Sequence, residues 1–197
     1  QISSDELSVT STGTFSDKNA ATGKTVTLVN TLGGADLGNY TITDQVTTTA
    51  DISKKSITLS GITASNKTYD GNNVATVFVT NANFGGKVSG DDLSVASTGT
   101  FSDKNAATGK TVTLVNTLGG ADLGNYTITD QATTTADINK KAISLNGITA
   151  ASKTYDGNNI ASVSVDEAVF KDMVAGDDLK VTSTGTFSDK NVATGKT

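Results

Sequence analysis

Cysteine, histidine, proline, tryptophan and arginine are all absent from this sequence of 197 residues. Without Cys the chain has no disulfide framework and no thiolate nucleophile or metal ligand. Without His it lacks the side chain that most often acts as a general base near neutral pH and most often binds metals. These absences argue against an enzyme, so we expect no catalytic residues and no bound cofactor.

The charged residues are also restricted in kind. All 15 basic residues are Lys, most of the 20 acidic residues are Asp, and the net charge is −5. A nucleic-acid-binding protein needs a basic surface that displaces counterions from phosphates, so we expect no nucleic-acid partner. No run of about 18 apolar residues occurs, so we expect no membrane insertion by this segment.

The sequence instead has extensive internal repetition. GTFSDKN occurs with its Phe at positions 15, 101 and 187, and KTYDGNN occurs with its Tyr at 69 and 155, so each spacing is 86 residues. Residues 11–45 are identical to residues 97–131. This period is longer than the roughly 20 to 50 residues of solenoid repeats and suits a domain that folds by itself.

Within one period, apolar residues alternate with Ser and Thr, as expected for half-buried strands. The clearest pairs are Ile57 and Leu59, Val77 and Val79, Leu93 and Val95, Val112 and Leu114, and Tyr126 and Ile128. Turn residues such as Asp70–Asn73 separate them. The pattern predicts an all-β chain of tandem Ig-like β-sandwich domains with six or seven short strands each; a β-grasp fold or a small barrel is the alternative.

One stretch differs between the copies, where residues 78–89 (FVTNANFGGKVS) align with residues 164–175 (SVDEAVFKDMVA). Loops tolerate sequence change better than strands do, so we expect a surface loop there. Phe84 and Phe170 keep their apolar character, which indicates that part of the loop packs on the core. In the later copy, DEAVFKDMV is expected to form one or two helical turns.

GKT ends at Thr25, Thr111 and Thr197, and it matches the end of a phosphate-binding loop. That motif requires a Gly five residues before its second Gly, where this chain has Lys18, Lys104 and Lys190. We therefore expect a turn that enters a strand at each of these places.

The segments KTYDGNN, GDDLSV, GTFSDKNAATGKTVTL and LGGADLGNYTITDQATTTADI, in this order, resemble the YDG-type repeat, a relative of the MBG-type repeats. Such repeats occur in tandem in large bacterial surface and secreted exoproteins, including filamentous-haemagglutinin-like, two-partner-secreted adhesins. The resemblance implies three parts: residues 1–53 (the first copy, a C-terminal part), residues 54–138 (the middle copy, complete) and residues 139–197 (the third copy, an N-terminal part).

The resemblance also implies an extracellular or bacterial cell-surface location. It implies a structural function as a spacer, stalk or filament shaft that projects a distal binding region. The expected partners are neighbouring repeats of the same chain and other copies of the protein in a filament or matrix. The alternative function is a multivalent adhesin repeat that binds carbohydrate or host protein weakly at each copy.

Two kinds of binding site follow from the residue types. Calcium prefers six to eight oxygen ligands, and acidic pairs at predicted turns could supply them: Asp91 and Asp92, with Asp177 and Asp178. Hydrated turns without a metal are the alternative. Tyr69 and Tyr155 could stack on a sugar ring, but aromatic residues at equivalent positions are also typical of a core.

Overall fold

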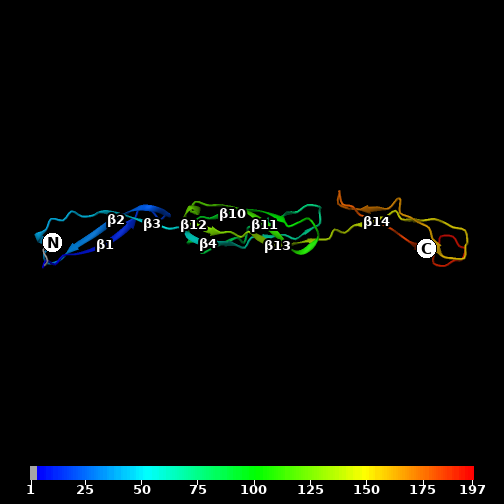
Figure 1. The fold of residues 1–197 in the computed structure, drawn as a ribbon, viewed down its shortest axis with the longest axis horizontal. Coiled ribbons are helices and arrows are strands. Elements are labelled where there is room, and N and C mark those ends of the chain that lie inside the picture. The colour runs from blue at the N-terminus through cyan, green and yellow to red at the C-terminus, as the bar shows by residue number, and fades with distance from the viewer. Residues whose placement is uncertain (1–3) are drawn as a thin grey trace. The chain divides into compact units, whose positions relative to one another are not determined.

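The computed structural model describes residues 4–197, and this part of the chain is all-β, as predicted (Figure 1). Its only helices are two single turns of 3₁₀ helix, η1 (Leu37–Asn39) and η2 (Leu123–Asn125). Neither could cross a bilayer, and no helix among residues 4–197 is long and apolar enough to do so.

The chain divides into two compact units that do not coincide with the sequence copies. The first unit comprises residues 1–64, 76–99 and 113–134, and the second comprises residues 65–75, 100–112 and 135–197. The division cuts through three strands of the middle copy, so β10 (Ser94–Phe101), β11 (Ala107–Gly119) and β13 (Thr133–Asn139) each contribute residues to both units.

The first copy forms a three-stranded antiparallel sheet in the order β1 (Ser8–Phe15), β2 (Ala21–Gly33) and β3 (Thr47–Ile52). Phe15 pairs with Val26 across the turn between β1 and β2. The register between β2 and β3 shifts between Ala21 and Lys24, where Gly23 has a φ of +63°. Such a bulge favours Gly because side chains disfavour positive φ.

The middle copy contains two larger sheets, which are consistent with a β-sandwich. One has the order β6 (Lys67–Thr68), β13, β11, β10 and β7 (Val74–Ala75), and the other has the order β12 (Tyr126–Thr129), β4 (Lys55–Ser60) and β9 (Asn83–Gly85). β12 pairs in parallel with β4, and β13 with β6. A further pair joins β5 (Thr63–Ala64) to β8 (Val77–Phe78).

The third copy forms three antiparallel strand pairs. They are β14 (Ser144–Asn146) with β18 (Val169–Lys171), β15 (Thr149–Ala150) with β17 (Val163–Ser164), and β16 (Ile160–Ala161) with β19 (Gly185–Thr186). The helical turns expected within residues 164–175 are wrong, because β18 is extended there and pairs with β14. The equivalent residues 83–85 form β9, so the variable stretch contributes an edge strand rather than only a loop.

Burial is concentrated in the middle copy. Of the eleven buried apolar residues among residues 4–197, ten lie between Ile57 and Ile138, and the other is Val26. The largest fully buried side chains are Phe101, Ile62, Ile138 and Val112. The alternation seen in the sequence therefore marks the core correctly in β4 and β11, where Ile57, Leu59, Val112 and Leu114 are all buried.

Two lysines are buried as well. Lys24 and Lys110 are each 8% exposed, and their ammonium groups lie 2.6 and 2.8 Å from the carboxylates of Asp17 and Asp103. Both are the Lys of the GKT segments, which lie within β2 and β11 as expected for a turn that enters a strand. The ion pair ties each strand to the turn before it and satisfies a charge that burial would otherwise penalise.

Candidate functional site

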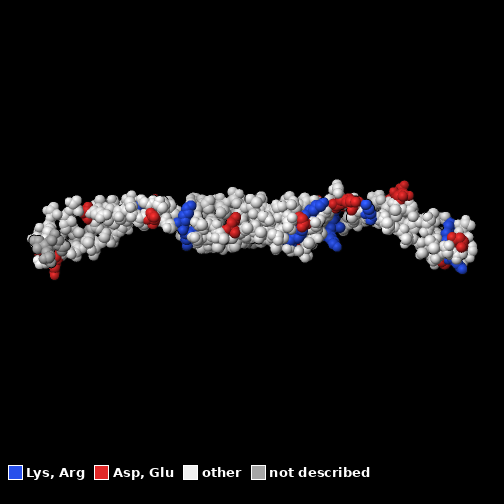
Figure 2. Space-filling model, viewed as in Figure 1, with Lys and Arg blue, Asp and Glu red and all other residues white. Residues whose placement is uncertain are grey.

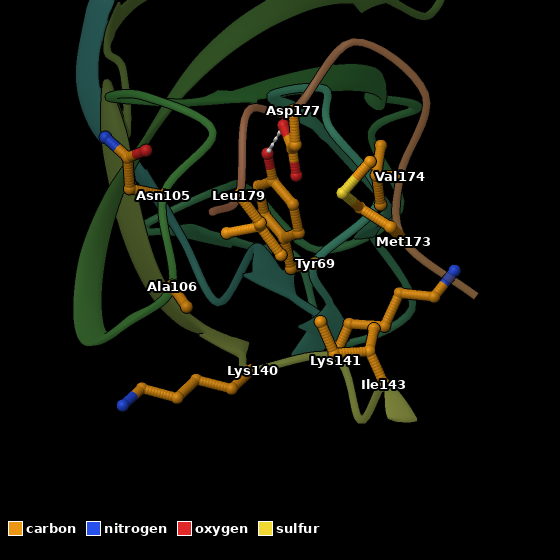
Figure 3. A pocket seen from close by; sticks show the side chains of 10 residues that line it. All are labelled: Tyr69, Asn105, Ala106, Lys140, Lys141, Ile143, Met173, Val174, Asp177 and Leu179. Carbon is orange, nitrogen blue, oxygen red and sulfur yellow. Dashed lines mark hydrogen bonds between the residues drawn. The ribbon is translucent and has the colours of Figure 1, made fainter. Parts of the chain in front are cut away.

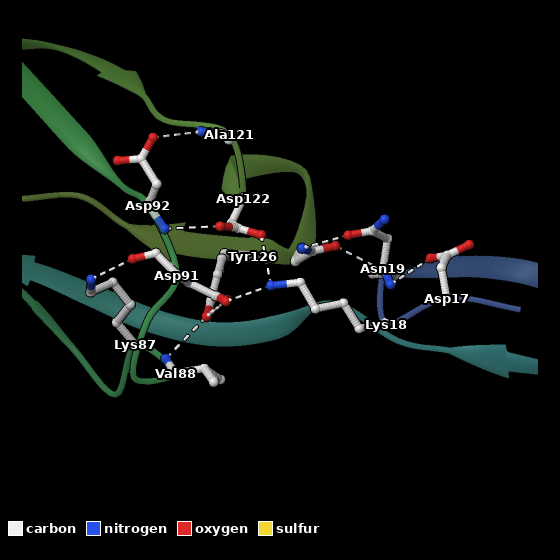
Figure 4. A network of polar contacts seen from close by, with 12 residues as sticks. Asp17, Lys18, Asn19, Lys87, Val88, Asp91, Asp92, Ala121, Asp122 and Tyr126 are labelled. Atoms are coloured by element: carbon white, nitrogen blue, oxygen red, sulfur yellow. Dashed lines mark hydrogen bonds and ion pairs between the residues drawn. The ribbon is translucent and has the colours of Figure 1, made fainter. Parts of the chain in front are cut away.

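The most distinctive polar cluster of the first unit joins the first copy to the middle copy (Figure 4). Lys18 lies in the turn between β1 and β2, and its ammonium group is 2.9 Å from the Asp91 carboxylate and 3.2 Å from the Asp122 carboxylate. These carboxylates come from the segment before β10 and from the turn before η2. We call Lys18, Asp91, Asp122 and the residues bonded to them the clamp.

Neighbouring amides extend the clamp. The backbone N–H of Ala20 donates to the side-chain oxygen of Asn125 at 2.8 Å, and the Asn125 amide donates to the side-chain oxygen of Asn19 at 3.2 Å. The N–H of Asn19 in turn donates to Asp17 at 2.7 Å, which fixes the turn that presents Lys18. Three consecutive residues of the first copy thus contact the middle copy.

Tyr126 holds Asp91 from the side of the middle copy. Its hydroxyl donates to Asp91 at 2.5 Å and accepts the backbone N–H of Val88 at 3.0 Å. The hydrogen bond from Tyr126, followed by that from Lys18, lowers the pKa of the Asp91 carboxyl. The hydrogen bond from Lys18 to Asp91 has the largest effect on the pKa of Lys18, which it raises, and the bond to Asp122 raises it further. Both groups are therefore held in their charged forms over a wider pH range.

The second compact unit repeats the central contact of the clamp, 86 residues later. Lys104 corresponds to Lys18 and Asp177 to Asp91, and the two lie 3.6 Å apart. The Tyr69 hydroxyl also donates to Asp177 at 2.7 Å, and this bond is the largest cause that raises the pKa of Tyr69. The interaction with Tyr69 is the largest cause that raises the pKa of Lys104, and the negative charge of Asp177 is the next.

A pocket of about 320 Å³ lies beside this contact (Figure 3). Its apolar lining includes Ile143, Met173, Val174 and Leu179, and its polar lining includes Tyr69, Asn105, Lys140, Lys141 and Asp177. All of these residues belong to the second unit.

The predicted calcium ligands have other partners or lie apart. Asp91 and Asp177 each face a Lys ammonium group, while Asp92 accepts the backbone N–H of Ala121 at 3.1 Å. Asp178 is highly exposed and lies 3.9 Å from Lys180. No group of three or more His, Cys, Asp or Glu residues that could hold a metal occurs among residues 4–197. Calcium binding stays a prediction without a preformed ligand set.

The two predicted sugar-stacking residues lie in different surroundings. Tyr69 is half-buried at the pocket wall, with its hydroxyl engaged by Asp177. Tyr155 is 56% exposed and lines a second hollow of about 610 Å³, together with Lys153, Phe187 and Lys190. Of the two, Tyr155 is the more exposed.

Sequence reasoning missed the lysines of the clamp, together with Asp122 and Asn125. The available signal was the SDKN turn, which keeps its Lys at positions 18, 104 and 190 although turn geometry requires only the Asp and the Asn.

Charged side chains elsewhere are scattered among neutral ones on the face drawn in Figure 2, with no continuous patch of one sign.

Comparison with protein families assigns all three copies to one type. The family model described as YDG domain matches residues 1–50, 53–136 and 139–197. No curated protein and no solved structure matches the chain.

Proposed function

Because the chain belongs to the YDG domain family along nearly its whole length, we propose that it is a structural spacer. In this proposal the repeats form part of a stalk or filament shaft of a bacterial cell-surface or secreted adhesin, and they hold a distal binding region away from the cell. The protein acts outside the cell and catalyses no reaction. Its reach grows by one repeat at a time.

The observation that carries this proposal is the recurrence of the central Lys–Asp contact of the clamp. The Lys18–Asp91 contact and the Lys104–Asp177 contact are separated by one period of 86 residues, although they lie in different compact units. A spacer needs the same contact at every junction, because only then does each added repeat contribute the same rise and rotation. Binding sites would instead require an equivalent open pocket in each copy.

The clamp is suited to orientation rather than to stability. Lys18 is 68% exposed at its side chain, so solvent screens its ion pairs strongly. Hydrogen bonds from Ala20 and Asn125 add direction, since they act only at short range and in a narrow range of angles.

Distances between spin labels in the first unit test the proposal. The chain has no native Cys, so Thr12→Cys with Thr98→Cys places one label on each side of the clamp at exposed strand positions. We expect a single narrow distance distribution, which broadens in the double variant Lys18→Glu and Lys104→Glu. The matched control is Lys54→Glu with Lys180→Glu, which makes the same change in net charge away from the clamp. A distribution equally broad in all three chains would contradict an orienting junction.

The second candidate function is a weak, multivalent binding of carbohydrate by each repeat. The exposed ring of Tyr155 and its hollow favour it. A glycan array probed with the whole chain tests it directly. Binding to one class of sugar that is lost in Tyr155→Ala and Tyr69→Ala would replace the purely structural function.

A further inference from the structure

The strands at the two ends of the middle copy pair in parallel. The chain enters this copy at β4 and leaves it after β13. β4 pairs in parallel with β12, which directly precedes β13, and β6 pairs in parallel with β13 itself. Both pairs have the same offset, with Lys55 opposite Tyr126 and Lys67 opposite Ile138. Segments from the start and the end of the copy are therefore bonded to each other.

Side chains join the same two segments beyond the paired residues. The Gln131 side-chain amide donates to the Ile62 carbonyl at 2.7 Å, and its oxygen accepts the Ile62 N–H at 2.9 Å. In the second unit, the side-chain oxygen of Asn66 accepts the N–H of Asp137 at 2.7 Å. Gln131 and Asn66 thus take the place of backbone partners and add bonds next to each of the two parallel pairs.

These bonds lie beside buried side chains. Ile57 and Leu59 of β4 are 3% and 4% exposed, and Ile62 is 1% exposed. Ala136 and Ile138 of β13 are 5% and 1% exposed. Hydrogen bonds in such surroundings are stronger than bonds in water, because the local dielectric is low and water does not compete for donor and acceptor. Breaking the parallel pairs therefore means breaking shielded bonds.

Parallel pairing decides how tension along the chain acts on the copy. Tension pulls β4 from its N-terminal end and pulls β12 and β13 toward their C-terminal ends. In a parallel pair these two ends lie at opposite ends of the ladder, so the force acts along the strands and loads all bonds of the pair together. In an antiparallel pair they would lie side by side, and the bonds would break one after another.

We propose that the middle copy bears tensile load, in shear, through the pairs β4–β12 and β6–β13 and through the bridge from Gln131 to Ile62. Under tension such a copy keeps its folded length, because several bonds must break before any chain is released. The inference concerns resistance to force within one copy, whereas the spacer function concerns the orientation of neighbouring copies. It does not rest on that function, and the two experiments can fail separately.

Force-clamp measurements on the 197-residue chain with two different attachments test the direction of loading. The chain has no native Cys, so handles can be attached at substituted positions. Lys54→Cys with Lys140→Cys pulls the parallel pairs in shear, whereas Lys54→Cys with Gly124→Cys pulls β4 away from the start of β12. All three positions are exposed, and nothing lies within 4 Å of a Cβ added at Gly124.

The lifetime of the folded copy at a fixed force is the quantity to compare. We expect it to be at least about tenfold longer with the attachment at 54 and 140, because two or more hydrogen bonds must break together. Equal lifetimes with the two attachments would overturn the proposal.

Replacing Gln131 tests the bridge. Gln131→Ala removes two hydrogen bonds to Ile62. It should shorten the lifetime about tenfold in the shear attachment and no more than about threefold in the other, because only shear loads these bonds from the start. The matched control is Asn116→Ala, which removes two bonds from β11 to residues 130 and 131 and should change both lifetimes by the same factor. An effect of Gln131→Ala that is equal in the two attachments would overturn the proposed role of this bridge.

Discussion

The first and middle copies contain an identical stretch, residues 11–45 and 97–131, yet its burial differs greatly between them. Phe15 is 36% exposed and Phe101 is 1% exposed, although they end the equivalent strands β1 and β10 of the two hairpins. Every residue of β1 is exposed, whereas β10 alternates between exposed and buried or half-buried residues. The same sequence therefore makes the same hairpin, β1–β2 and β10–β11, but residues 126–129 form β12 whereas residues 40–43 form no strand, and burial is concentrated in the middle copy.

Local polar contacts, in contrast, are the same in both copies. Asp17 binds Lys24 as Asp103 binds Lys110, and the N–H of Gly23 donates to Asp51 as that of Gly109 donates to Asp137. The difference in burial follows the strands that lie against the identical stretch. In the middle copy, residues 55–85 supply β4, β6, β7 and β9, which pair with or lie beside its strands.

The largest effect that separates the copies is expected from truncating the equivalent Phe residues. Phe101→Ala should lower the free energy of unfolding of the middle copy by about 3–5 kcal/mol, because it empties a fully buried site. Phe15→Ala should cost no more than about 1 kcal/mol, since its ring is already in contact with water. Segment-resolved hydrogen exchange measures both. Equal losses of protection in β2 and β11 would contradict the burial difference.

The next largest effect concerns a glycine whose geometry is shared by the two copies. Gly120 has a φ of +108°, and a Cβ there would lie 2.3 Å from the carbonyl oxygen of Asp92. Gly120→Ala should therefore cost more than about 2 kcal/mol, from backbone strain and the clash together. Gly34→Ala meets the same obstacle at the Glu6 carbonyl oxygen and should be as disruptive locally.

Gly109→Ala is the control for these two substitutions. Its φ is +60°, but nothing lies within 4 Å of the added methyl group. It should cost only about 1 kcal/mol, the conformational penalty of the left-handed region. Urea unfolding followed by circular dichroism compares the three variants, and a Gly109→Ala variant as unstable as Gly120→Ala would show that the close approach is unimportant.

Replacing the buried lysines should have a smaller effect on stability, and this effect should be equal in the two copies. Lys24 and Lys110 have the same exposure and the same type of partner, so Lys24→Met and Lys110→Met should destabilise their turns alike, by about 1 kcal/mol. The value is modest because Asp17 and Asp103 remain about half exposed and can be solvated. Exchange rates of the amides at Asn19 and Asn105 report each turn separately. A clearly larger effect in the middle copy would show that these contacts are not local.

The smallest effect is a dependence on pH that both copies should share. The bond from Lys24 lowers the pKa of Asp17, and the bond from Lys110 lowers that of Asp103, each from the usual value of 3.8. Lowered carboxyl pKa values contribute stability that is fully present above 3.8 and is lost as the pH falls below it. Acid titration of the unfolding midpoint should show this loss, and Asp17→Asn with Asp103→Asn should flatten it. An unchanged acid limb would contradict the contribution of these pairs.

Much of the secondary structure was predictable because it depends on residues that are close together in the sequence. Alternating apolar residues located β4, β11 and β12, and the turn at Asp70–Asn73 is held as expected, with the N–H of Asn72 donating to Asp70. The helical turns expected within residues 164–175 did not form, since pairing with β14 outweighs the weak local preference of DEAVFKDMV. The parallel pairing of β12 with β4 joins residues about 70 positions apart and had no local signal.

The contacts of the clamp could not be predicted from the sequence either. The sequence singled out Asp91 and Asp177 as calcium ligands, which stays a prediction, and gave no sign of their contacts with Lys18 and Lys104. Lys18 and Asp91 are separated by 73 residues, so their contact depends on how two copies meet and not on any spacing within one. The sequence period shows that this Lys recurs, but it does not show which carboxylate the Lys contacts.

The sequence by itself determined the period of 86 residues, the strands and turns within it, and the short-range ion pairs such as Asp103–Lys110, because these involve residues close together in the chain. Only the tertiary structure decided which of the identical strands are buried and which Lys contacts which Asp. These outcomes depend on what packs against a segment, and an identical segment cannot encode two different surroundings.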